Sequence, residues 1–122
     1  MALHFDQTSG FKSARNDIED YRYEKTLEGT KDEQKAIESV EKFSNDLESV
    51  FSTLETMYQK PRKDDCDGIK SFPLSAGRYR LFYKIRIHND NFTITLLDID
   101  DNKQSNLDRF PSHSIIEFED ES

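Results

Sequence analysis

The sequence has a single cysteine, Cys66, so no disulfide can form within the chain. Its first residues, MALHFDQTSG, lack the basic and apolar segments of a secretory signal peptide. No apolar run approaches the roughly 20 residues that a membrane-spanning helix needs. These absences predict a cytoplasmic protein that does not enter a membrane.

Sites for metals, phosphates and covalent catalysis are also missing from the sequence. No glycine-rich phosphate-binding loop is present, and the three histidines show no ligand spacing. The segment DIDDNKQSNLDR begins like a calcium loop, but it has Lys103 where such a loop needs Gly and Arg109 where it needs Glu. Three neighbouring carboxylates would make Cys66 a poor nucleophile. The sequence therefore predicts no metal and no cofactor.

What is present is charge, and it is unevenly distributed. The 122 residues fit one domain, 1–122, with a net charge of −8. Residues 1–60 carry a net −5, residues 61–99 a net +2 and residues 100–122 a net −5. Only the middle segment could attract a polyanion by itself, and the acidic total argues against a dedicated nucleic-acid binder.

Apolar spacing predicts a helical hairpin over residues 9–60. The first helix, about 9–27, has Thr8 among its candidate N-caps and Gly29 at its end. The second helix begins at a capping box of Thr30 and Glu33 and ends near Lys60, before Pro61. Its apolar positions are Ile37, Val40, Phe43, Leu47, Val50, Leu54 and Met57. Part of this stripe could outrun the sheet and form a homodimer or partner surface.

The second half of the chain changes to a period of two residues. IKSFPLS, RYRLFYKIRI and FTITLLDI, within residues 68–99, predict three consecutive strands, and ALHF predicts a short strand within residues 1–8. The fold class is therefore α+β in the order β-α-α-β-β-β, with the hairpin on one face of an antiparallel sheet. Residues 100–122 form an acidic segment whose SIIEFEDES could add an edge strand.

The segment GRYRLFYKIRIH separates into two faces when its residues alternate along a strand. One face is apolar and can pack on the helices. The other carries cations and one aromatic ring, and two interpretations of it remain open: a solvated face balanced by acidic neighbours, or a surface that binds phosphates, bases or an acidic protein segment. The residues of this candidate binding surface are Arg78, Arg80, Phe82, Lys84 and Arg86.

The order of elements and the word YRLFY, Tyr79 to Tyr83, resemble the RelE/ParE toxin superfamily of bacterial toxin–antitoxin modules. The resemblance covers most of the chain in layout. It implies a toxin that acts on mRNA at the ribosome or on gyrase and is neutralised by a cognate antitoxin. It also implies that Arg80 lies on the exposed side of the sheet, where RelE-type members hold mRNA.

The sequence departs from RelE-type ribonucleases where those place further catalytic groups. Asp100, Asp101 and Asp108 stand where basic residues and a tyrosine are expected, and carboxylates there would repel a phosphate backbone. Arg80 and His88 are the only weak catalytic candidates. The alternative is therefore a catalytically inactive binding module whose basic face binds an acidic protein segment, with the chain's own tail EFEDES as one candidate.

Overall fold

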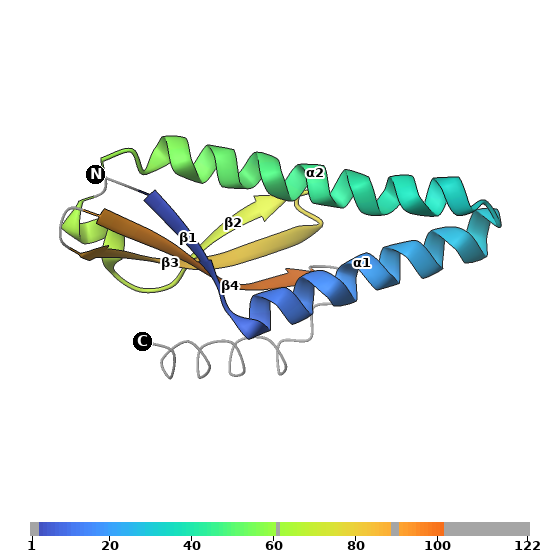
Figure 1. The fold of residues 1–122 in the computed structure, drawn as a ribbon, viewed down its shortest axis with the longest axis horizontal. Coiled ribbons are helices and arrows are strands. Elements are labelled where there is room, and N and C mark those ends of the chain that lie inside the picture. The colour runs from blue at the N-terminus through green and yellow to red at the C-terminus, as the bar shows by residue number, and fades with distance from the viewer. Residues whose placement is uncertain (1–2, 61, 89–90, 102–122) are drawn as a thin grey trace.

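The computed structural model describes residues 3–60, 62–88 and 91–101. Its elements are β1 (Leu3–Gln7), α1 (Ser9–Thr30), α2 (Glu33–Met57), the short 3-10 helix η1 (Lys63–Cys66), β2 (Lys70–Leu74), β3 (Tyr79–His88) and β4 (Asn91–Asp101). This order confirms the predicted α+β class (Figure 1). Most of the acidic segment, including the tail EFEDES, lies outside the described residues.

The four strands form one sheet in the order β1-β4-β3-β2. The pairs β2–β3 and β3–β4 are antiparallel, as the predicted meander requires. Strand β1 pairs in parallel with β4, so the sheet is mixed. The connection is long enough for parallel pairing, because the whole helical hairpin and two strands separate β1 from β4 in the chain. The hairpin covers one face of this sheet (Figure 1).

The core lies between the hairpin and this face of the sheet. Helix α2 contributes four buried side chains to it, Phe43, Leu47, Val50 and Leu54, at successive steps of four, three and four residues. Strands β3 and β4 contribute alternate residues, as expected of strands with one covered face. The side chains with almost no exposure include Phe11, Phe43, Leu47, Leu54, Leu81, Ile85, Ile94, Leu96 and Ile99.

Thr8 joins the start of α1 to an irregularity in β4. The β3–β4 register shifts between Phe82, opposite Asp98, and Tyr83, opposite Leu96, so Leu97 is an extra residue in β4. The buried Thr8 hydroxyl accepts a hydrogen bond from the N–H of Phe11 at 3.0 Å and donates one to the Leu97 carbonyl at 3.0 Å. One side chain therefore caps a helix and satisfies the carbonyl of the bulge.

We expect Thr8→Ala to lower the free energy of unfolding by about 1–3 kcal/mol, because it removes an N-cap and leaves a buried carbonyl without this partner. Urea denaturation monitored by circular dichroism measures the loss. Thr8→Ser keeps the hydroxyl and should recover most of the stability. If both variants lose the same amount, the methyl group of Thr8, and not its hydroxyl, stabilises this junction.

The connection between the helices differs from the prediction. Helix α1 continues through Gly29 to Thr30, and Lys31 adopts the left-handed conformation that ends it (φ 53°). Asp32 is the N-cap of α2, accepting from the N–H groups of Gln34 and Lys35. The predicted capping box of Thr30 and Glu33 is therefore wrong: the Thr30 hydroxyl already donates to a carbonyl within α1. Helix α2 ends at Met57.

The tip of the hairpin extends beyond the sheet (Figure 1). Leu27, in the last turn of α1, and Ile37, in the predicted apolar stripe of α2, are exposed. The other exposed member of the α2 stripe is Met57, at the opposite end of the helix. The stripe thus contributes to the core only where the sheet lies beneath it. In the part of the chain that the structure describes, no helix is apolar enough over a sufficient length to span a membrane.

Candidate partner-binding site

Strand β3 presents a row of cations on the sheet face away from the helices. Tyr79, Leu81, Tyr83 and Ile85 are buried, and the residues between them are partly or fully exposed. Buried and exposed side chains therefore alternate from Tyr79 to Ile85, as the sequence predicted. Ile87 is 40% exposed because it lies near the end of the strand. The row on the outer face consists of Arg80, Phe82, Lys84, Arg86 and His88.

The bulge at Leu97 brings two carboxylates to this face. In an unbroken strand, Asp98 and Asp100 would lie on the same side as Phe92 and Ile94, in the core. The extra residue reverses the alternation, so that Asp98 lies opposite Phe82 and Asp100 opposite Arg80. The adjacent leucines in FTITLLDI were the sequence signal for this reversal, and the sequence interpretation missed it.

The positive charge of Arg80 is consequently offset by a neighbouring carboxylate. Its Nη1 donates to the hydroxyl of Ser71 on β2 at 2.8 Å, and Asp100 lies opposite it on β4. A phosphate approaching this guanidinium would meet a carboxylate beside it. Arg80 therefore lies on the predicted face, but its position favours a structural role within the sheet over anion binding.

Arg78 does not belong to the row. It precedes β3, and its Nε and Nη2 donate to the two carboxylate oxygens of Asp101 at 3.0 and 3.1 Å. This bidentate pair raises the pKa of Arg78, with the hydrogen bonds to Asp101 as the largest cause and burial acting against them. The predicted row of four cations is thus reduced to Arg80, Lys84 and Arg86.

Lys84 and Arg86 form the centre of the remaining positive surface. Their opposite residues on β4 are Thr95 and Thr93, which carry no charge. Neither cation forms an ion pair with any residue that the structure describes. Lys84 is half-buried and Arg86 is exposed, so both are accessible to a partner.

Two cavities lie beside this pair of cations, and both are lined by Lys84 and Arg86. One, of about 210 Å³, lies on the outer face of the sheet between β1 and β3. Its other lining residues are Asp6, Gln7, Thr8, Thr95 and Leu97. The second, of about 730 Å³, lies along the edge of β3. Its other lining residues are Lys63, Cys66, Ile85, Ile87 and His88.

The second cavity follows from the shortness of β2. Strand β2 pairs only with Tyr79–Tyr83, whereas β4 pairs with the whole of β3. From Lys84 to Ile87, β3 has no strand beside it on the β2 side among the described residues. Helix η1 lies near this half of the edge and leaves the cavity open. Unpaired backbone groups at such an edge can accept an added strand.

The two weak catalytic candidates do not come together. Arg80 and His88 share one face of β3 but are eight residues apart, which corresponds to about 26 Å along a strand. They cannot act on one phosphodiester. The nearby Tyr83 is buried, its hydroxyl lies 2.9 Å from that of Tyr58, and burial with this hydrogen bond raises its pKa, so it stays protonated and is no general base.

Within residues 3–60, 62–88 and 91–101, no three His, Cys, Asp or Glu side chains gather in a way that could hold a metal ion. Lys103, Asp108, Arg109 and His113, which the sequence interpretation weighed, lie outside the described residues. Comparison with known proteins adds no assignment: no family model matches the sequence, and no curated protein matches it.

Proposed function

We propose that this chain is a RelE/ParE-like component of a bacterial toxin–antitoxin module that works by binding, and that a cognate antitoxin neutralises it. The antitoxin segment that binds the outer face of the sheet is acidic and extended. The observation that carries this proposal is the pair of cations Lys84 and Arg86, which forms no ion pair with any described residue, lines a cavity on each side and borders an open stretch of strand edge.

Each feature supports one part of the recognition. The ammonium group of Lys84 and the guanidinium group of Arg86 attract carboxylates. The open edge from Lys84 to Ile87 offers backbone hydrogen bonds to an added strand. The exposed Ile87 provides an apolar contact at the same edge. An acidic peptide with alternating apolar residues matches all three.

The experiment is expression of the protein in a bacterial host, alone and together with the product of the adjacent gene. We expect the protein alone to stop growth, and co-expression to restore growth and to yield a complex that survives purification. Normal growth at high expression, with the protein shown to be folded and abundant, would contradict an active toxin.

A second candidate function is a binding module without toxicity. Asp100 favours it, because it places a partly exposed carboxylate opposite Arg80, on the face where RelE-type toxins hold mRNA. Such a module would bind the acidic partner and leave growth unchanged. Salt-dependent binding of an RNA oligonucleotide to the purified protein would count against this candidate, and its absence would remove RNA as a ligand.

A further inference from the structure

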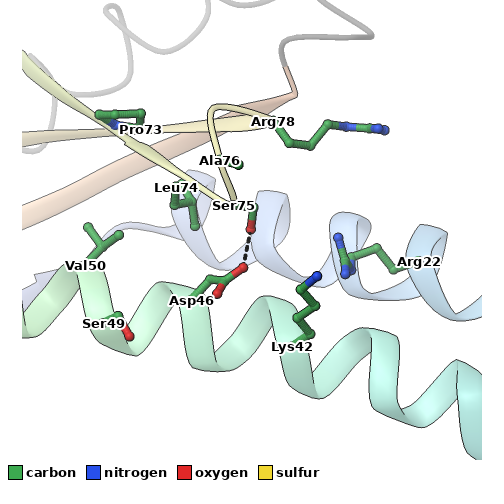
Figure 2. A pocket seen from close by; sticks show the side chains of 10 residues that line it. All are labelled: Arg22, Lys42, Asp46, Ser49, Val50, Pro73, Leu74, Ser75, Ala76 and Arg78. Atoms are coloured by element: carbon green, nitrogen blue, oxygen red, sulfur yellow. Dashed lines mark hydrogen bonds between the residues drawn. The ribbon is translucent and has the colours of Figure 1, made fainter.

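A separate cavity lies on the helix side of the molecule, away from the Lys84–Arg86 couple. It has a volume of about 540 Å³, within the range of sites for small organic ligands. Helix α1, helix α2, the end of β2 and the turn between β2 and β3 line it, and Figure 2 shows the ten lining side chains. It does not depend on the proposed partner-binding function.

The cavity has a cationic end and an apolar end. Arg22 and Lys42 lie near one another at one end in Figure 2, and the Arg78 side chain extends away from them beyond the turn. Val50, Pro73 and Leu74 lie at the other. This separation of charge and apolar surface suits a ligand that is itself an anion at one end and apolar or flat at the other.

The two arginines are held in place and keep donors unused. Arg22 Nε donates to the Ser39 carbonyl at 2.9 Å and its Nη1 to the Tyr79 hydroxyl at 3.3 Å. Arg78 uses Nε and Nη2 for Asp101. Among the described residues, this leaves Nη2 of Arg22 and Nη1 of Arg78 without a hydrogen bond. Guanidinium groups fixed in this way lose little entropy when they bind an anion.

Lys42 adds a positive charge that is not neutralised. It is exposed on α2 and forms no ion pair with any residue that the structure describes. The cavity's own carboxylate, Asp46, accepts a hydrogen bond from the Ser75 hydroxyl at 2.7 Å, on the side of the turn (Figure 2). Arg78 and Asp101 neutralise each other. Arg22 and Lys42 therefore face one carboxylate, Asp46, and the described residues leave a net positive charge at this end.

The turn that forms the wall of the cavity is strained and fixed. Ser75 and Ala76 have φ of 51° and 55°, a left-handed conformation that is unfavourable for non-glycine residues. The hydrogen bond from Ser75 to Asp46 ties this turn to α2. Strain that the surrounding structure maintains is concentrated at ligand sites in proteins.

We propose that this cavity binds a small organic phosphate of about mononucleotide size, with the phosphate between Arg22 and Lys42 and the apolar part against Val50 and Leu74. Phosphate suits the cationic end because guanidinium donors and a lysine match its several oxygens. In a chain of net charge −8, such a site needs this local excess of positive charge.

The test is a titration of the full-length, isotope-labelled protein with AMP, adenosine and inorganic phosphate, followed by the amide chemical shifts. We expect AMP to give saturable shifts at residues 74–78 and around Asp46, and adenosine and phosphate to bind at least about tenfold more weakly. Absence of saturable shifts at millimolar AMP, or shifts confined to another surface, would overturn the proposal. So would adenosine or phosphate binding as tightly as AMP.

Lys42→Gln tests the cationic end directly. The side chain is exposed, so the variant should fold normally, and its affinity for AMP should fall about five- to tenfold through the loss of one charge-assisted contact. Lys35→Gln is the matched control, since Lys35 is also exposed on α2 and does not line the cavity. Equal AMP affinities of the two variants would overturn the assignment.

Discussion

Replacing Phe43 by alanine is expected to lower the free energy of unfolding by about 3–5 kcal/mol. The side chain has no exposed area, and its ring lies 5.2 Å from that of Tyr79 in an edge-to-face arrangement. The Arg22 guanidinium lies 5.9 Å from the centroid of the Phe43 ring. The substitution therefore removes buried apolar area, one aromatic pair and one cation–π contact, and leaves a cavity beneath α2.

Urea denaturation followed by circular dichroism measures this loss. Phe43→Leu keeps most of the volume and should cost about 1–2 kcal/mol, which separates the cavity from the loss of the ring. Met57→Ala is the control on the same helix, because Met57 is 55% exposed and its removal should change stability by at most about 0.5 kcal/mol. A loss below about 1 kcal/mol for Phe43→Ala would mean that the hairpin does not pack on the sheet as described.

The expected size of this effect follows from how little core the molecule has. The overhanging tip of the hairpin contributes no burial against the sheet, so α2 is held chiefly by Phe43, Leu47 and Leu54. A domain of this size has about 5–15 kcal/mol of stability in total. Loss of one of these three anchors can therefore leave a substantial unfolded fraction under mild denaturing conditions.

The helices and the faces of β3 could be predicted because each depends on local periodicity. The step of three and four residues from Phe43 to Leu54 requires only a helix with one covered side. The alternation from Tyr79 to Ile85 requires only a strand with one covered side. Both patterns are consequences of the same apolar face, and no distant residue needs to be known to interpret them.

The site could be predicted only in part, because its charge balance depends on residues far apart in the sequence. The pairing of Arg78 with Asp101 spans 23 residues and removes one cation from the predicted row. The bulge at Leu97 decides on which face Asp98 lies, and it is held by Thr8, 89 residues away. The sequence interpretation considered β3 alone, whereas the electrostatics of a sheet face are set by all its strands.

The dependence on distant residues also explains why the accessible positive charge lies at Lys84 and Arg86, whereas the sequence pointed to Arg80. Arg80 matches the family resemblance and was the first candidate from the sequence. Its neighbours in the sheet, Ser71 and Asp100, could not be known without the register. Lys84 and Arg86 remain accessible because their β4 neighbours are threonines and because β2 stops before it reaches them.

Reversing both charges, in Lys84→Glu with Arg86→Glu, is expected to weaken binding of the proposed acidic partner by about 100-fold. The two groups carry the positive charge between the two cavities, and two glutamates there would repel the partner's carboxylates. The fold should be unaffected, because Arg86 is exposed and Lys84 is half-buried on an outer face. Isothermal titration calorimetry with the co-purified partner measures the change.

The matched control is Lys25→Glu with Lys35→Glu, which makes the same change in net charge on the exposed surface of the helices. If long-range attraction between the whole molecules drives binding, both double variants should weaken it equally. If the surface around Lys84 and Arg86 is the binding site, the control should change affinity by less than about threefold.

Salt provides the second readout of the same experiment. Raising the ionic strength from 0.1 M to 1 M shortens the Debye length from about 10 Å to about 3 Å, so binding to the unmodified protein should weaken. The double variant at Lys84 and Arg86 should show a much shallower dependence, because the attraction that salt screens has already been removed. A steep dependence that persists in this variant would place the partner's acidic segment on another surface, and the open edge of β3 would then have a different role.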